Sequence, residues 1–436
     1  MKRIIGFLAL FSLFSGVVFA LEQGQIDIHG FISQGYLRTD HNNYLAQTEE
    51  GSFEFNELGL NFGTDLTDKL RIGMQFFARD LGKYGNDDLV LDWAFADYRW
   101  RDWLGFRVGR IKFPFGYYNT IRDFDMLRTS LFASQSVYSE LLRDTYSFIK
   151  GASLYGYQPL GGLGNLSYSY ITGIGNVAEE TGLVGAHENF FAIYNLKINE
   201  ASNRQAHAMD LQWETPLSGM MLGCSLYYFK DMYFEGTLGG NGGFADLLNL
   251  SYLREYQDFK GYFLTLRYAF GDFVFLSECT STRIETQLSP NKREEDPTYL
   301  KSNDIISQGW YVSLAYRLNP FLEIEYAYSE FYPDRENKDG KATYPDTPLY
   351  RATGVYGGLL GNEVPKLFYG IDFEAWKKTS TVSFRFDINE NWLIKLETAY
   401  NDGFGDYTSA DNGDTIATRN LKRYWWLYAA KVTYNF

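Results

Sequence analysis

Cysteine, histidine and proline are all scarce in this chain of 436 residues, which contains 2, 4 and 10 of them. Two cysteines cannot build a disulfide scaffold, and four histidines offer little material for a metal centre or a catalytic triad. After residue 20, no apolar run approaches the roughly 20 residues that a membrane-spanning helix needs. The sequence therefore excludes a helical membrane protein, and we expect no cofactor, no metal site and no enzymatic activity.

The N-terminal segment differs from the rest of the chain. Lys2 and Arg3 precede an apolar run, and Val18-Phe19-Ala20 is a small-residue pattern of the kind that signal peptidase cleaves. We therefore predict that residues 1–20 are a cleaved signal peptide. Removing Lys2 and Arg3 from the 40 basic side chains leaves 38 against 54 acidic ones, a formal charge of −16. This balance fits an exported protein and argues against a nucleic-acid partner.

Aromatic residues are abundant. The chain has 35 phenylalanines, 35 tyrosines and 9 tryptophans, and 42 glycines add to them. This aromatic content is high for a soluble protein. Amphipathic strands with aromatic girdles produce such a composition, because only every second residue of a membrane-spanning strand must be apolar.

The clearest alternation is in the last segment, RYWWLYAAKVTYNF, residues 423–436. The even-numbered positions from Tyr424 to Phe436 are aromatic or aliphatic, whereas the odd-numbered positions include Arg423, Lys431 and Asn435. Period 2 predicts a strand with one face on lipid and the other on water. A last strand that ends on phenylalanine resembles the C-terminal signal that the barrel-assembly machinery of outer membranes recognises.

The same alternation recurs along the chain. It predicts strands at 25–37, 52–63, 70–81, 89–100, 105–113, 147–157, 164–174, 204–215, 220–231, 260–270, 273–284, 305–318, 321–332, 376–388, 392–402 and 422–436. All ten prolines lie outside these ranges, and short connections alternate with long polar ones. We therefore predict an all-β fold. Residues 21–436 form one 16-stranded antiparallel transmembrane β-barrel with long outer loops and short periplasmic turns.

Cys224 and Cys279 fall on predicted strands that are separated by one other strand. Two inter-strand spacings of about 4.8 Å place their Cα atoms beyond the disulfide limit of about 7 Å. We therefore expect two free thiols.

The segment YYNTIRDFDMLRTS, residues 117–130, concentrates opposite charges in the third long connection, residues 114–146. The candidate constriction residues in and beside it are Arg107, Arg110, Lys112, Arg122, Asp123, Asp125, Arg128 and Arg143. Two interpretations remain open. Unpaired arginines would attract anions to a pore, whereas arginines paired with Asp123 and Asp125 would only hold the loop in place.

Charged residues also recur on the predicted inward faces of the strands. The candidate pore-wall residues are Arg71, Arg79, Arg267, Arg317, Glu323, Glu325, Arg385, Arg423 and Lys431. Across all the inward faces, basic and acidic residues balance, so any ionic preference should come from the constriction.

Sixteen predicted strands, a terminal phenylalanine and a long third loop resemble the trimeric diffusion porins of Gram-negative outer membranes. The run RVGRIKFPFGYYN, residues 107–119, is also similar to phosphate- and anion-type porins. The resemblance implies that residues 114–146 fold into the pore as a constriction, and it implies a homotrimer among outer-membrane lipid and lipopolysaccharide. The expected function is passive diffusion of small hydrophilic solutes with a mild anion preference.

Alternative functions make different demands on the sequence. A substrate-specific channel for sugars or organic acids would use Phe113, Phe115, Tyr117 and Tyr118 as an aromatic slide. A structural or adhesive barrel would not conduct. A plugged receptor does not fit, because only LEQGQ separates the predicted cleavage site from the first strand. A hydrolase is disfavoured, because the strand that carries His29 supplies no triad.

Overall fold

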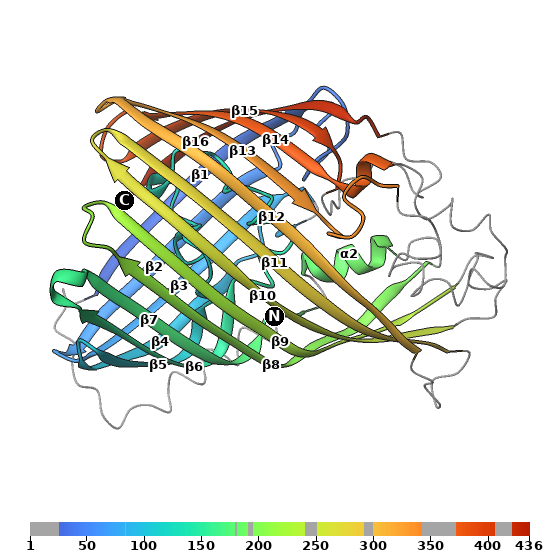
Figure 1. Ribbon diagram of the computed structural model, residues 1–436, viewed down its shortest axis with the longest axis horizontal. Coiled ribbons are helices and arrows are strands. Elements are labelled where there is room, and N and C mark those ends of the chain that lie inside the picture. The colour runs from blue at the N-terminus through green and yellow to red at the C-terminus, as the bar shows by residue number, and fades with distance from the viewer. Residues whose placement is uncertain are drawn as a thin grey trace, which may run out of the picture.

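The structure is a computed structural model, and it describes residues 26–82, 84–178, 181–190, 195–239, 251–291, 300–341, 372–405 and 421–436. Sixteen strands form one closed antiparallel barrel in which each strand pairs with its neighbours in sequence. The first and last strands close it (Figure 1). The prediction of a 16-stranded antiparallel barrel is confirmed. Residues 1–20 lie outside the described residues, so the signal peptide stays a prediction.

The strands alternate in direction around the barrel. Their bounds are β1 Asp27–Thr39, β2 Phe55–Thr67, β3 Leu70–Leu81, β4 Val90–Arg101, β5 Leu104–Lys112, β6 Phe148–Pro159, β7 Asn165–Gly175, β8 Lys197–Glu214, β9 Met220–Thr237, β10 Tyr252–Phe270, β11 Phe273–Asn291, β12 Leu300–Asn319, β13 Leu322–Tyr332, β14 Lys377–Asp387, β15 Trp392–Gly403 and β16 Tyr424–Asn435. Tight turns join them at one end, as between β10 and β11 at residues 271–272. The connections at the other end are long, as predicted, and that end carries the short helix α2, Gly182–Phe190 (Figure 1).

Closure satisfies the backbone of the terminal strands. Gly30 and Phe436 exchange two backbone hydrogen bonds of 3.0 Å, and the β1–β16 ladder continues from Phe31 opposite Asn435 to Thr39 opposite Leu427. A barrel without free edges leaves no ladder group unpaired in a bilayer, where an unsatisfied N–H or C=O costs several kcal/mol. This explains why the chain closes rather than ending in an open sheet.

The two faces of the wall follow the predicted alternation. On β16 the odd-numbered residues Trp425, Leu427, Ala429 and Lys431 are buried inside, whereas Tyr424, Trp426 and Tyr428 are exposed outside. Exposed Leu, Ile, Tyr and Trp side chains recur on the outer face of other strands, including Ile32, Leu264 and Leu314. An apolar outer band on a closed barrel is the form in which strands cross a membrane. No helix in the described part of the chain is long and apolar enough to span a bilayer.

Several strands are longer than the alternation predicted. β8 begins at Lys197 rather than 204, β10 begins at Tyr252 rather than 260, and β11 runs to Asn291 rather than 284. In the extension of β10, the buried positions include the polar Glu255 and Gln257, and the outward positions include Arg254 and Asp258. Polar residues thus lie on both faces, so pairing continues without an apolar alternation to reveal it. Two prolines consequently lie inside strand ends, Pro159 in β6 and Pro290 in β11. The prediction that all prolines avoid the strands is wrong at these two positions.

The cysteines lie as expected. Cys224 on β9 and Cys279 on β11 both stand opposite Leu264 of the intervening strand β10, and neither forms a disulfide. Because paired positions share a face and Leu264 is exposed, both thiols belong to the outer face of the barrel.

Candidate functional site

The connection between β5 and β6, residues 113–147, crosses the interior of the barrel; we call it the inward loop. Its far end reaches the opposite wall. The Leu131 amide donates to Oε2 of Glu397 on β15 at 2.7 Å, and Thr433 of β16 donates to Oδ2 of Asp125 at 2.7 Å. Arg385 of β14 donates to the carbonyl oxygen of Met126 at 2.6 Å. A segment of about 35 residues is thus held inside the lumen rather than above it.

One side of the inward loop is attached by aromatic packing. The Phe115 ring lies 4.6 Å from that of Phe263 on β10, and the Phe113 ring lies 5.3 Å from that of Phe229 on β9, between centroids. Both loop rings are almost completely buried. Burying a phenylalanine side chain contributes about 1.5–3 kcal/mol, so this contact anchors the loop. Phe113 and Phe115 therefore lie in the apolar core between the loop and the wall.

Glu278 of β11 fastens the same side of the loop by hydrogen bonds. Its carboxylate accepts from the Tyr117 amide at 2.7 Å and from the Tyr138 hydroxyl at 2.6 Å. Gly116 makes this approach possible: its φ is 57°, and a Cβ there would lie 2.3 Å from Oη of Tyr138 and 3.0 Å from Oε1 of Glu278. Only glycine adopts this backbone conformation at such close contact without strain.

The other side of the inward loop carries a continuous network of ion pairs. Glu140 accepts from Arg122 at 2.6 Å, from Arg79 at 3.1 Å and from Arg143 at 3.3 Å. Arg143 also pairs with Asp123 at 2.9 Å and with Glu57 of β2 at 2.6 Å. All of these side chains are about nine-tenths buried or more.

Asp125 and Asp123 are the other two centres of this network. Asp125 pairs with Arg128 at 2.8 Å and with Lys431 of β16 at 2.8 Å, and Lys395 of β15 lies 3.9 Å away. Asp123 pairs with Lys112 at the end of β5. The full network comprises seven cations, Arg79, Lys112, Arg122, Arg128, Arg143, Lys395 and Lys431, and six carboxylates, Glu57, Asp92, Asp123, Asp125, Glu140 and Asp144.

The contacts favour the interpretation in which the loop arginines are paired with carboxylates. Arg122 pairs with Glu140 rather than Asp123, and Arg128 pairs with Asp125. The side chains of both arginines are at most 6% exposed. Burial raises the pKa of the loop carboxyls of Asp123, Asp125 and Glu140, but the adjacent cations lower it by more, so each pKa lies below its ordinary value.

The remaining candidates near the constriction lie outside this network. Arg107 pairs with Asp97 at 2.8 Å and lies over the ring of Tyr155. Arg110 stands opposite Ala94 and Lys150, donates to the carbonyl oxygen of Asp92 at 3.0 Å, and covers the ring of Phe148.

The wall candidates divide into deep and shallow positions. Arg79 and Lys431 are buried in the network, and Glu323 and Arg317 form a half-exposed pair at 2.6 Å. The other partly or largely exposed cations are Arg71, 3.9 Å from Asp65; Arg385, 2.8 Å from Asp387; Arg423, 2.6 Å from Asp402; and Arg267, whose guanidinium lies over the ring of Tyr117 at 5.6 Å. Glu325 is 7% exposed and lines a cavity.

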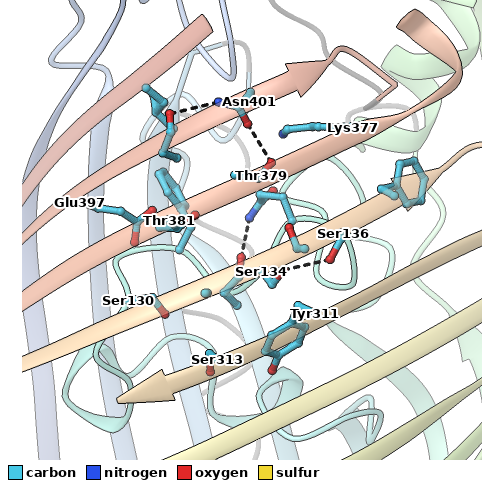
Figure 2. Close-up of a pocket in the computed structure, with 18 of the residues that line it drawn as sticks. Ser130, Ser134, Ser136, Tyr311, Ser313, Lys377, Thr379, Thr381, Glu397 and Asn401 are labelled. Carbon is cyan, nitrogen blue, oxygen red and sulfur yellow. Dashed lines mark hydrogen bonds between the residues drawn. The ribbon is translucent and has the colours of Figure 1, made fainter. Parts of the chain in front are cut away.

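This cavity lies between the inward loop and the wall formed by β12 to β16. It has an empty volume of about 770 Å³ that is continuous with solvent. Its lining is rich in hydroxyl groups, as Figure 2 shows for Ser130, Ser134, Ser136, Tyr311, Ser313, Thr379 and Thr381. Glu325, Glu397 and Lys377 are the charged residues among the lining residues.

Small side chains keep the wall of the cavity open. One row across adjacent strands runs Ser313, Ala327, Thr381 and Ala399, and the next row runs Tyr311, Ser329, Thr379 and Asn401. The row on the other side of the first contains Glu325, Ser383 and Glu397. Sequence reasoning missed this lining. Neutral serine, threonine and alanine on inward faces carry no signal beyond the alternation itself.

Known structures supply the comparison for the whole chain. OmpF from Salmonella typhi, in complex with daunomycin, covers 94% of this chain over 97% of its own, at 12% identity and a TM-score of 0.50. An anion-selective porin from Comamonas acidovorans aligns with 94% of this chain across 99% of its own chain, at 10% identity and a TM-score of 0.50. A loop-deletion mutant of OmpT, an outer membrane protein of Vibrio cholerae, aligns with 94% of this chain across 99% of its own chain, at 9% identity and a TM-score of 0.51.

The chain has the fold of an outer-membrane porin. The predicted resemblance to these proteins is confirmed at the level of fold. No protein-family model matches the sequence, and no curated protein matches it.

Proposed function

We propose that this protein is an outer-membrane channel through which small hydrophilic solutes diffuse passively. The observation that carries the proposal is the polar cavity between the inward loop and β12 to β16, inside a barrel with an apolar outer face. A solute in such a cavity keeps hydroxyl and water partners, so it avoids the cost of entering hydrocarbon. The inward loop, held on both sides, sets the size limit.

The ionic preference of the proposed channel is weak. The charges of the loop network are buried and paired with one another. The cavity lining adds two carboxyl groups and one amino group. The mild anion preference expected from the sequence stays a prediction, and Arg122 and Arg128 support it little because both are ion-paired.

Three further parts of the proposal rest on analogy. A homotrimer is proposed because a form of the similar Vibrio cholerae OmpT is a trimer. Outer-membrane lipid and lipopolysaccharide would surround the apolar band, and the barrel-assembly machinery would act on β16. We propose a transporting rather than a catalytic role.

Planar-bilayer recording tests the proposal. The purified protein should give discrete current steps in KCl. A barrel that inserts, migrates as a folded species in unheated electrophoresis and carries no current would contradict the proposal and favour a structural or adhesive barrel.

A further inference from the structure

Four polar side chains that line the cavity have no protein partner. Ser130, Ser313, Ser329 and Glu325 are 6–8% exposed, and within the described residues their side chains make no hydrogen bond or ion pair. Their oxygen atoms remain accessible to solvent, so each can form a hydrogen bond with a molecule in the cavity. These groups all face one solvent-connected space, so their partners must come from whatever occupies it.

The other charges of the cavity are already engaged. Glu397 accepts from the Leu131 amide at 2.7 Å and from the Ser383 hydroxyl at 2.9 Å. Lys377 donates to the Tyr44 hydroxyl at 2.6 Å and lies 3.8 Å from the centre of that ring. Glu325 is therefore the one charged group of the described lining whose hydrogen-bonding capacity is unused.

The electrostatics of the cavity disfavour charged occupants of either sign. Glu325 and Glu397 stand on either side of Ser383 in one row, so this row offers an anion no cationic partner. The next row towards the turns runs Arg317, Glu323, Arg385 and Lys395. Arg317 pairs with Glu323 and Arg385 pairs with Asp387, so this row offers a charged solute no free counter-ion. A neutral molecule crosses both rows without a net penalty.

The surface of the lining indicates which kind of neutral molecule fits the cavity. The empty volume of about 770 Å³ includes open solvent, so the cavity is a recess open to solvent rather than a closed pocket. Hydroxyl groups donate and accept, a carboxylate accepts, and the rings of Phe132, Tyr118 and Tyr311 offer apolar surface among them. Many hydroxyl partners beside aromatic faces suit a molecule with hydroxyl groups on its edge and C–H groups on its faces.

We propose that this cavity is a binding site for an uncharged saccharide, with Glu325 accepting from its hydroxyl groups. This inference rests on the proposed channel function and names its solute class. Ser313 and Ser329 supply hydroxyl contacts from the wall, and Ser130 supplies one from the inward loop.

The test is the effect of sucrose on ionic current through the full-length protein in a planar bilayer. Sucrose should reduce the current saturably and more than an oligo(ethylene glycol) of equal mass, which has no internal donors. Glu325→Ala should weaken the block roughly tenfold, and Ser313→Ala with Ser329→Ala should do the same, because each removes hydrogen bonds that cost about this much when lost. Glu325→Gln, which keeps an acceptor, should weaken it less.

The control is Ser380→Ala. Ser380 lies on β14 between Thr379 and Thr381 but on the opposite face, opposite the exposed Tyr400, so its replacement should leave the block unchanged. Unheated electrophoresis establishes that each variant is folded.

Failure of this inference is separable from failure of the channel. A conducting protein whose current falls equally with sucrose and with the glycol would overturn the saccharide site alone. Block by spermidine that exceeds block by sucrose, and that Glu325→Gln abolishes, would instead assign the cavity to cations and overturn the inference. Absence of ionic current before any solute is added would contradict the proposed channel function itself.

Discussion

Glu140 shows how single residues determine the course of the inward loop. It is nearly completely buried and accepts from three arginines, two of the loop and one of β3. Charges at such depth contribute only when each has its partner, because desolvation of an unpaired ion is costly. Asp123 and Asp125 follow Arg122 closely in the sequence. The carboxylate that Arg122 pairs with, Glu140, is eighteen residues further on.

We therefore predict that Glu140→Ala destabilises the protein by roughly 3–5 kcal/mol, the usual cost of removing one partner of a buried pair. Three guanidinium groups would each lose their ion pair with Glu140. The guanidinium chloride midpoint of the purified barrel in micelles measures it. Glu390→Ala, in the exposed turn between β14 and β15, serves as the control and should leave the midpoint unchanged. Equal midpoints for both variants would show that the network adds nothing to stability.

At the scale of elements, the inward loop behaves as one unit fastened on two sides. Aromatic rings and Glu278 hold it to β9, β10 and β11, whereas ion pairs and hydrogen bonds hold it to β2, β3 and β14 to β16. The aromatic attachment is independent of pH over the range in which proteins function. The ionic attachment depends on the ionised carboxyl groups of Asp123, Asp125 and Glu140.

The pH dependence of the loop follows from the lowered pKa of these carboxyls. A carboxyl whose pKa is lower in the folded protein contributes stability that is fully present above its unfolded pKa of about 4 and is lost as the pH falls through the folded pKa. We predict the same single-channel conductance at pH 7 and pH 4.5, with any release of the loop confined to more acidic solution. A step change in conductance between pH 7 and pH 4.5 would contradict this account.

At the scale of the whole molecule, charges of both signs are distributed so that little net field remains along the lumen. The charges of the deep network are paired with one another, and on the wall Arg317 pairs with Glu323 and Arg385 with Asp387. In the proposed channel, such a lumen would separate solutes by size and by hydrogen bonding more than by charge. The chain as a whole is acidic, at −14, yet this net charge does not set the field where a solute passes.

We predict a small reversal potential in a tenfold KCl gradient, on the anion side. Strong cation selectivity of the unmodified protein would contradict the predicted preference.

The sequence by itself determined the barrel. Alternation along strands such as β13, β14 and β16 assigned one face to lipid and the other to the lumen. Counting these alternating segments gave sixteen strands, because a strand in a bilayer must be apolar on one face only. The alternation of short and long connections agreed with that count. The sequence also determined that Cys224 and Cys279 lie too far apart for a disulfide, since one strand separates them.

Only the tertiary structure decided which loop charges pair and where a solute has room. The pairs of Arg122 with Glu140 and of Asp125 with Lys431 join residues far apart in the chain, and period-2 patterning carries no information about them. The cavity arises from the distance between the inward loop and rows of serine, threonine and alanine on β12 to β15. Such rows exist only when the barrel register places those residues side by side, which is a property of the assembled sheet.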